Sequence, residues 1–473
     1  MQLPNIKDAR IRTKEKIEVS YDKYKVPESI HNIGHNKTYT ILTYGCQMNV
    51  HDSENISGIM EDLGYTKEEN YEKADVIIIN TCAIRENAQN KVVGILGRIK
   101  KLKETNPNII TIIGGCMPQE ESVSNMIKDK YKWVDIVLGT HNIYDIPTLL
   151  ENITKERKQN IEVYSVEGSI IENLPVKRNS KIKAWVNIQY GCDKFCSYCI
   201  VPYTRGKQRS RLPKDILKEV EELKNKGYKE VTLLGQNVNA YGKDLEESYT
   251  MANLLEDVAK TGIDRIRFVT SHPWDFSSDM IDIIAKYPNI MPYIHLPIQS
   301  GSDNILKKMN RRYTIAEYKK LFHELKDKIP KVSITTDIIV GFPGETEEDF
   351  EETLDVVRKV RYDSAFTFIY SKRTGTPAAK MDNQVPEEVV KPRFDRLLKE
   401  VQEISIEESA RLTGQTLPVL VEEINDHDAS LVTGRLSNNL LVHFPGTADL
   451  IGKIVDVYLA ECKGFYYMGE MKK

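Results

Sequence analysis

The chain has 473 residues, of which 40% are hydrophobic and 29% are charged, and its formal net charge is −3. This length predicts two to four domains with separate cores, and the balanced charge gives no overall sign of nucleic-acid binding, so any RNA contact has to come from local basic patches. The first residues, MQLPNIKDARIRTK, contain no apolar segment typical of a signal peptide, and the apolar runs are too short to span a membrane, so we expect a soluble, cytoplasmic protein.

Residues 1–37 are polar with mixed charges, and we expect a flexible or loosely docked extension. From 38 to 150, apolar strand-like runs alternate with helical patterns such as the one at 86–105. The strand-like runs lie at 39–45, 74–81, 109–115 and 133–140. They are apolar nearly throughout, as strands covered on both faces must be, so this segment predicts a doubly wound parallel α/β domain.

Residues 151–180 lose this alternation and predict a polar interdomain linker. From 181 to 409 the alternation resumes in longer units, beginning with a helix predicted over 213–226, which starts at Pro213 and stops at Gly227. The strand-like runs lie at 184–190, 230–237, 265–272, 293–299, 334–342 and 365–370. Six strand–helix units predict a partial (β/α)6 barrel, whose lateral opening suits a bulky substrate.

The last segment, 410–473, has a purely β pattern. Five short runs, from TLPVLVEE to FYYMGEM, are separated by turn residues. Five strands in so short a segment predict a small, all-β barrel of the oligonucleotide-binding type.

Three of the seven cysteines are closely spaced in the stretch GCDKFCSYC, as Cys192, Cys196 and Cys199. An odd number of cysteines without a signal peptide argues against a disulfide framework. The C-x3-C-x2-C loop follows the first strand of the predicted barrel, and active sites of such barrels lie at the carboxyl ends of their strands. Three thiolates can hold a 4Fe-4S cluster with one iron open; the alternative is a zinc knuckle completed by a distant residue.

Cys46, Cys82 and Cys116 each follow a strand of the first predicted domain. Because parallel strands end at the same edge of a sheet, we expect these three cysteines to lie together where α/β sheets bind ligands. A single cysteine there is more often packing, but three equivalent positions predict ligands of a second cluster, again with one iron open. Cys462 has no such partners, and we expect it to be structural.

The cysteine loop at 192–199 resembles the signature of radical SAM enzymes. Two cysteine triads followed by a small β barrel resemble the methylthiotransferases, over residues 38–473. The resemblance implies an N-terminal domain with an auxiliary cluster, a radical SAM core and a TRAM domain that contacts RNA. Seven stretches narrow the resemblance to the branch that modifies isopentenylated adenosine in tRNA. They are YGCQMNVHDSE, NTCAIRENA, YGCDKFCSYCIVPYTRGKQRSR, LLGQNVNAYG, TSHP, HLPIQSGSDNILKKMNRRYT and DIIVGFPGETEEDF.

The resemblance implies two 4Fe-4S clusters and S-adenosylmethionine (SAM) as cofactors. It implies tRNA as substrate, a flavodoxin- or ferredoxin-like reductant and a monomeric enzyme without membrane contact. In the implied reaction, one SAM methylates a sulfur on the auxiliary cluster, and a second SAM yields the radical that removes hydrogen from C2 of an N6-dimethylallyl adenine beside the anticodon. The methylthio group then joins that carbon, and no side chain is predicted to be catalytic.

Polar residues after the barrel strands are candidate SAM contacts, although turns and caps favour the same residue types. These candidates are Gln236, Asn237, Ser271, His272, Gln299, Ser300, Asp337 and Glu345. Basic residues near the cysteine loop are candidate RNA-phosphate contacts, with a solvated loop or local ion pairs as the alternative. They are Arg205, Lys207, Arg209, Arg211, Arg311 and Arg312. In the last domain Phe465, Tyr466 and Tyr467 are candidates for stacking on bases, although aromatics there are more often core.

Three functions stay open from the sequence. The first is a tRNA methylthiotransferase, acting on N6-dimethylallyladenosine or on another tRNA adenosine. The second is a methylthiotransferase that acts on an aspartate of a ribosomal protein. The third is a non-catalytic iron–sulfur carrier or zinc-bearing RNA-binding module, against which the six-unit barrel argues, since a carrier does not need one.

Overall fold

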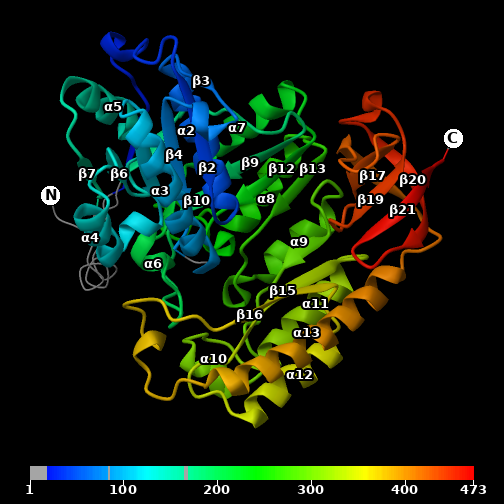
Figure 1. Ribbon diagram of the computed structural model, residues 1–473. Helices are drawn as coiled ribbons and strands as arrows, with labels where there is room; N and C mark the ends of the chain where they lie inside the picture. Colours follow the sequence, from blue (N-terminus) through cyan, green and yellow to red (C-terminus); the bar gives the residue numbers. More distant parts are fainter. Residues whose placement is uncertain (1–18, 84–85, 165–168, 473) are drawn as a thin grey trace.

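The computed structural model describes residues 19–83, 86–164 and 169–472, and Figure 1 shows it as three parts in a row. The N-terminal part, blue to cyan, lies against one end of a central barrel in green and yellow. The red C-terminal part lies against the other end of this barrel. Residues 1–18 of the expected extension and 165–168 of the expected linker fall outside the described residues. Within the described residues, no helix is both long and apolar enough to cross a membrane.

The N-terminal part is built on a six-stranded parallel sheet with the order β3-β2-β4-β5-β6-β7. Its strands are β2 (Thr38–Thr43), β3 (Thr66–Lys67), β4 (Val76–Thr81), β5 (Ile110–Gly115), β6 (Ile136–Leu138) and β7 (Asn160–Glu162). Its helices are α2 (Gln47–Asp62), α3 (Glu86–Thr105), α4 (Glu121–Lys130) and α5 (Ile146–Lys155). Helices cover both faces, because α2 and α5 share one apolar core with the sheet, whereas α3 and α4 share another. The predicted doubly wound fold is confirmed.

The structure differs from the expected extension and linker at three short strands. β7 joins the N-terminal sheet, and β1 (Ser20–Lys23) pairs in parallel with β8 (Ser169–Glu172). Strands of three or four residues are too short to show a period in the sequence. Their order comes from long-range pairing, so part of the expected linker is an integral part of the fold.

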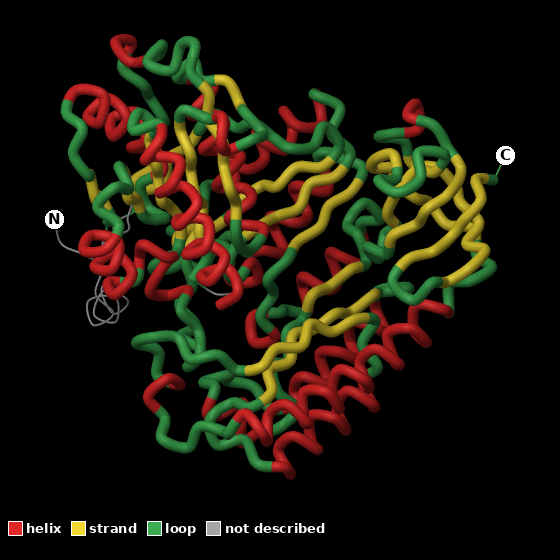
Figure 2. Tube along the Cα trace, in the orientation of Figure 1, coloured by secondary structure: helices red, strands yellow, loops and turns green. Residues whose placement is uncertain are grey.

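The central part contains two three-stranded parallel sheets, β9-β12-β13 and β14-β15-β16, joined by a bridge between Ile266 and Ile290. The strands are β9 (Lys183–Asn187), β12 (Glu230–Leu234), β13 (Arg265–Phe268), β14 (Tyr293–His295), β15 (Ser333–Val340) and β16 (Ser364–Ile369). The helices that follow are α6 (Val201–Thr204), α7 (Pro213–Asn225), α8 (Met251–Lys260), α9 (Ser278–Lys286), α10 (Asp303–Lys308), α11 (Ile315–Lys328), α12 (Glu347–Val360) and α13 (Glu387–Ala410). Figure 2 shows these strands as an open, curved wall with helices on its outer side. The predicted partial barrel is confirmed.

Most barrel strands end before the predicted runs do. β12 ends at Leu234 and β13 ends at Phe268, whereas the strand-like runs predicted from the sequence extend to 237 and 272. The residues beyond the strand ends leave the sheet as loops at its carboxyl edge. The candidate SAM contacts Asn237 and His272 therefore lie in these loops and not on the strands.

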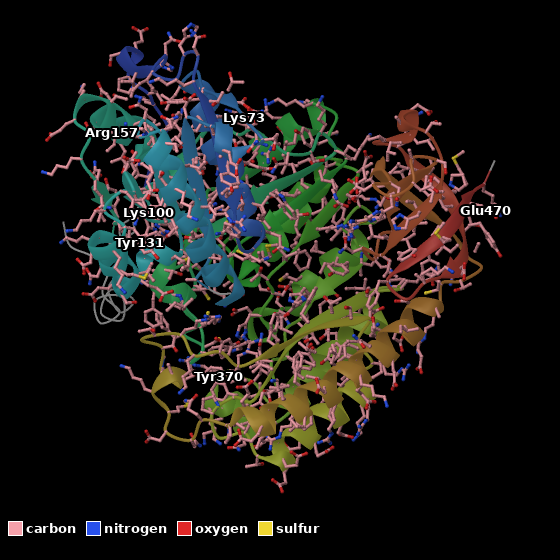
Figure 3. The ribbon with its side chains drawn as sticks, in the orientation of Figure 1. Lys73, Lys100, Tyr131, Arg157, Tyr370 and Glu470 are labelled. Carbon is pink, nitrogen blue, oxygen red and sulfur yellow. The ribbon has the colours of Figure 1, made fainter. Side chains whose placement is uncertain are left out.

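The C-terminal part is a closed five-stranded barrel with the order β17-β18-β19-β21-β20, as predicted. Its strands are β17 (Thr416–Ile424), β18 (Leu431–Arg435), β19 (Leu441–Pro445), β20 (Ile454–Cys462) and β21 (Tyr466–Met471). Two arginines of β13 attach it to the base of the central barrel. Arg265 donates to the carbonyls of Arg435 and Pro418, and Arg267 donates to those of Leu436 and Ser437. Figure 3 shows Tyr370, which follows β16, far from Glu470 on the outer side of this small barrel.

Candidate active site

The first cysteine triad lies at one edge of the N-terminal sheet. Cys46 follows β2 and caps α2, Cys82 follows β4, and Cys116 follows β5. These three strands are direct neighbours in the sheet, so the expected convergence is found. Burial, together with the nearby Cys82 and Cys46, raises the pKa of the Cys116 thiol to about 12, although the charge of Arg205 acts to lower it. Gly45 keeps the approach open, because a Cβ there would lie 2.6 Å from the Cβ of Cys82.

The second triad lies in the loop between β10 (Gln189–Tyr190) and α6. Cys192 and Cys196 are buried and Cys199 is half-buried. Burial, and then the neighbouring Cys196, raise the pKa of Cys199 to about 12, and the pKa of Cys192 is also raised, by burial and by both other thiols. A backbone hydrogen bond attaches this loop to the end of α10, because Ser197 N–H donates to the Met309 carbonyl at 2.9 Å.

The first triad packs against the segment of chain that follows the second. Cys116 and Ala83 of the first domain form one small apolar cluster with Ile200, which directly follows Cys199, and with Tyr203 in the next turn of chain. Thr140 also donates from its Oγ1 to the Thr204 carbonyl at 2.7 Å, across the same boundary. The structure therefore packs the cysteine edge of the N-terminal sheet against the segment that follows the second triad.

Each triad offers three thiols as ligands. Among the described residues, no three cysteine, histidine or acidic side chains are placed to hold one metal ion. A mononuclear zinc site needs its ligands to converge on one point, whereas each cysteine of a cubane cluster binds its own iron. The donor set, three cysteines within one loop or along one sheet edge, fits a cluster better than a single ion.

Each triad has a buried arginine beside it. Arg205 donates to Asp52 Oδ2 at 2.6 Å and to Asn49 Oδ1 at 3.3 Å. Burial alone would lower the pKa of Arg205, but Asp52, Cys116 and Cys46 hold it well above its ordinary value. At the second triad, Arg311 Nη1 lies 3.6 Å from the Sγ of Cys196.

These contacts correct the prediction for the basic residues. Arg205, Arg209, Arg211 and Arg311 are buried, so they form no exposed surface for phosphates. Arg211, for example, makes two hydrogen bonds to the Glu172 carboxylate and one to Glu219. Of the six basic candidates, Arg312 is exposed and Lys207 is half-buried. A buried guanidinium is stable only when paired, and here the pairing partners are remote in sequence.

Several candidate SAM contacts lie beside the second triad. Gln236 accepts a hydrogen bond from the Gly191 N–H at 2.5 Å, so it orients the loop that carries Cys192. Asn237 Oδ1 and Ser271 Oγ are buried and make no hydrogen bond among the described residues. His272 is buried, and burial, then the charges of Arg311, Lys194 and Lys243, lower its pKa.

The remaining candidates lie on the β14–β15 side of the barrel. Gln299 has φ +71° and exchanges backbone hydrogen bonds with β15, and Ser300 is buried beside Thr353. Asp337 Oδ2 lies 3.3 Å from His295 Nε2. Glu345 serves its own loop, because one oxygen accepts from the Gly341 and Phe342 N–H groups and the other faces Arg393. Burial raises the pKa of Glu345 to about 7.

In the C-terminal barrel, the three aromatic candidates have different surroundings. Tyr467 is fully buried and donates to the Ser409 carbonyl, so it belongs to the core and stacks on no base. Tyr466 is half-buried, with its ring 4.9 Å from that of His443. Phe465 is 65% exposed and is the member of the set that a ligand can reach. Cys462 packs against the barrel core, as expected of a structural residue.

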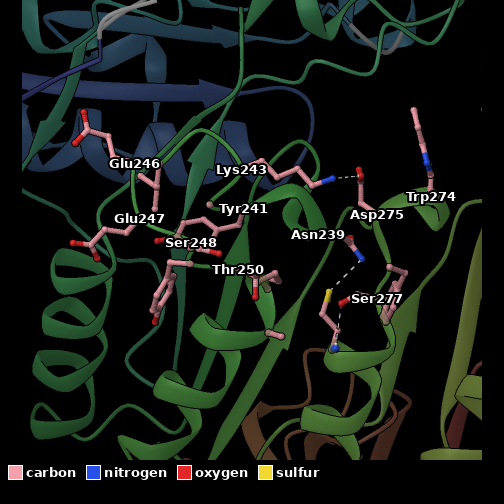
Figure 4. Close-up of a pocket in the computed structure, with 17 residues that line it drawn as sticks. Asn239, Tyr241, Lys243, Glu246, Glu247, Ser248, Thr250, Trp274, Asp275 and Ser277 are labelled. Atoms are coloured by element: carbon pink, nitrogen blue, oxygen red, sulfur yellow. Dashed lines mark hydrogen bonds and ion pairs between the residues drawn. The ribbon is translucent and has the colours of Figure 1, made fainter.

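The sequence reasoning missed a cluster at Asp275. This buried carboxylate binds Lys194 and Asn237 at 2.7 Å and Lys243 at 2.6 Å. Burial would raise the pKa of Asp275, but these hydrogen bonds hold it below its ordinary value. Lys194 lies inside the cysteine loop, so Asp275 ties that loop to a pocket of about 580 Å³ beside α8 (Figure 4). The signal in the sequence that could have pointed to this cluster was Lys194, a charged residue between Cys192 and Cys196.

Comparison with family models agrees with this architecture. Residues 186–357 match the radical SAM superfamily, residues 38–139 match the uncharacterized protein family UPF0004, and residues 410–472 match the TRAM domain. Among solved structures, a radical SAM methyltransferase from Kitasatospora setae, TsrM, aligns with 72% of this chain and 76% of its own, with a TM-score of 0.53 and 14% identity. At this identity the likeness concerns the fold alone.

Curated relatives match over nearly the whole chain. A protein from Staphylococcus saprophyticus is 52% identical over 99% of this chain and 91% of its own length. One from Geobacillus thermodenitrificans is 51% identical over 99% and 90%, and one from Lachnoclostridium phytofermentans is 53% identical over 95% and 98%. All three are named tRNA-2-methylthio-N(6)-dimethylallyladenosine synthase.

Proposed function

The chain belongs to the tRNA-2-methylthio-N(6)-dimethylallyladenosine synthase family, and from this premise we propose that it inserts a methylthio group at C2 of N6-dimethylallyladenosine next to the anticodon of tRNA. The observation that carries the proposal is the packing of Cys116, from the first triad, against Ile200, which directly follows the last cysteine of the second triad. Transfer of sulfur to an unactivated carbon needs a site that activates the carbon beside a site that holds the sulfur. A single triad would supply only one of them.

Each triad offers three thiols to a 4Fe-4S cluster and leaves one iron without a protein ligand. Cys192, Cys196 and Cys199 would hold the cluster that binds SAM. The auxiliary cluster would be held by Cys46, Cys82 and Cys116. When bound, these groups supply the reductive cleavage of SAM that allows a hydrogen atom to be removed from an unactivated carbon, and the sulfur that replaces it.

The chain's own residues position these groups. Buried polar atoms without a partner are costly, and Asn237 Oδ1, Ser271 Oγ and Gln189 Oε1 are three such atoms beside the second triad. They are suited to bind the polar groups of SAM. Gln236 holds the cysteine loop through the Gly191 N–H, and Asp275 holds it through Lys194.

Three of the candidate contacts, His272, Gln299 and Ser300, stay predictions that rest on their place in loops at the carboxyl edge of the barrel. Asp337 also stays a prediction, whereas the contacts of Glu345 favour a structural role in its loop. The division at 38–150, 181–409 and 410–473, the flavodoxin- or ferredoxin-like reductant, the monomeric state and the cytoplasmic location are part of the proposal as well.

The names of the relatives favour tRNA over a ribosomal protein as the substrate. The test is to digest tRNA from a strain that lacks this protein and to measure methylthio-adenosine by mass spectrometry. We expect the methylthio form to disappear and the isopentenyl form to accumulate. An unchanged level of methylthio-adenosine would rule out the tRNA assignment.

An anaerobic count of iron and sulfide tests the third possibility, a carrier or a zinc module. Two clusters require roughly eight irons per chain. One zinc and no sulfide would contradict the enzymatic proposal.

A further inference from the structure

An exposed tryptophan lies next to the second triad. Trp274 belongs to the short helix η6 (Pro273–Asp275), which follows β13, and 45% of it is exposed. It lies between His272 and Asp275, and Asp275 binds Lys194 of the cysteine loop. Its indole ring is therefore open to a ligand at the carboxyl edge of the barrel.

Two cations lie against the indole ring. Lys194 Nζ is 4.2 Å from the ring centroid, and the guanidinium of Arg312 is 5.1 Å from it. Lys194 comes from between Cys192 and Cys196, and Arg312 follows Arg311, which contacts Cys196. Both cations are therefore fixed to the loop that carries the second triad.

The charges around the ring are mainly positive. Lys194 and Lys243 share the single carboxylate of Asp275, and Arg312 lies over the ring itself. Figure 4 shows Lys243 reaching Asp275 beside Trp274, whereas Glu246 and Glu247 lie on the opposite side of the pocket. An exposed aromatic ring flanked by cations is suited to a stacked base with its phosphates nearby.

We propose that Trp274 stacks on an unpaired base of the tRNA anticodon loop while Arg312 neutralises an adjacent phosphate, an inference that rests on the proposed function. RNA recognition of single-stranded loops uses this combination of aromatic stacking and cationic side chains. Trp274 and Arg312 hold the anticodon loop at the carboxyl edge of the central barrel, beside the second triad. A protein partner such as the reductant is the competing occupant.

The test is the affinity of the reconstituted full-length enzyme for an anticodon stem-loop that carries N6-dimethylallyladenosine. Trp274→Ala should weaken binding by about 5- to 150-fold, the range expected for one base–aromatic stack. Trp274→Phe should recover most of the loss. RNA should also quench the tryptophan fluorescence of the native enzyme, and this quenching should be lost in Trp274→Phe, since a merely structural role would not produce it.

Arg312→Ala tests the phosphate contact, and Lys286→Ala is its matched control. Lys286 also covers an aromatic ring, that of Tyr287, at 4.9 Å, but it lies at the end of α9, on the outer side of the barrel. Arg312→Ala should weaken binding and reduce the slope of affinity against salt by about 0.7–0.9, whereas Lys286→Ala should change neither.

RNA affinity equal to that of the native enzyme in both Trp274→Ala and Arg312→Ala would overturn the inference. The same result with slower reduction by flavodoxin would also overturn it and identify the reductant as the occupant. If the native enzyme itself fails to bind the stem-loop, the proposed function fails first. Iron content and the thermal unfolding midpoint show that each variant is folded and loaded.

Discussion

A buried arginine couples the two cysteine triads at the scale of single residues. Arg205 follows the second triad in the chain but contacts Asp52 and Asn49 beside the first. Asn49 Oδ1 in turn lies 3.6 Å from the Sγ of Cys46. The guanidinium therefore links the radical SAM part to the cap of α2, and its removal would leave a buried carboxylate without its partner.

Arg205→Met should destabilise the protein by about 3–5 kcal/mol, because a buried charge loses its counter-charge. The double variant Arg205→Met/Asp52→Leu should recover a large part of that loss. The measurement is a double-mutant cycle of unfolding, with the exposed pair Lys359–Asp355 as control, for which less than about 1 kcal/mol is expected. Additive effects of the two substitutions would contradict the coupling.

Sequence reasoning placed all six cysteines correctly at strand ends or in one loop, but it left Arg205 and Arg211 open between contacts to RNA phosphates and local ion pairs. A cysteine after a periodic apolar run is a local signal. The fate of an arginine depends on carboxylates such as Asp52 and Glu172, which the fold brings from distant parts of the chain. No local pattern distinguishes a paired, buried arginine from one that is free to bind phosphate.

At the scale of elements, three parallel strands deliver their cysteines to one edge because β2, β4 and β5 are adjacent. The apolar runs showed these strands plainly, since both faces of each strand are covered. By contrast, β1, β7 and β8 exist through long-range pairing and escaped detection. The close approach of the residues that follow β2 to Cys82, which follows β4, depends on a glycine, Gly45, with φ +133°.

Gly45→Ala should displace Cys82, because the added Cβ would lie 2.6 Å from its Cβ and 3.1 Å from its Sγ. We expect the iron content to fall from roughly eight toward roughly four per chain, with the second cluster retained. Gly97→Ala is the matched control, since Gly97 is exposed on α3 with nothing within 4 Å of the added atom. Full iron content in Gly45→Ala would show that the triad does not require this close approach.

At the scale of the whole molecule, the small β barrel is attached at the end of the central barrel opposite to the N-terminal part (Figure 1). Its attachment uses Arg265 and Arg267, whose side chains reach backbone carbonyls about 170 positions later in the chain. Both arginines are buried on a barrel strand, and the sequence offers no sign of this role.

Arg267→Ala should loosen the C-terminal barrel without unfolding the N-terminal sheet. The variant removes hydrogen bonds to the Leu436 and Ser437 carbonyls and leaves the buried Glu230 unpaired. Hydrogen exchange should speed up in β18 and stay unchanged in β4. Arg396→Ala, which removes an exposed arginine paired with Glu347 and Glu351, is the control and should alter neither strand. Equal protection of β18 in both variants would contradict the docking role.

The central claim is that the two triads serve separate tasks, and Cys82→Ala tests it most directly. The reconstituted variant is given SAM, a reductant and the modified stem-loop under anaerobic conditions, and deoxyadenosine and methylthio-adenosine are measured in the same sample. Because Cys82 belongs to the first triad alone, deoxyadenosine should still form while methylthio-adenosine is absent. Loss of deoxyadenosine in a variant that keeps the iron of the second triad, or continued formation of methylthio-adenosine, would contradict the account.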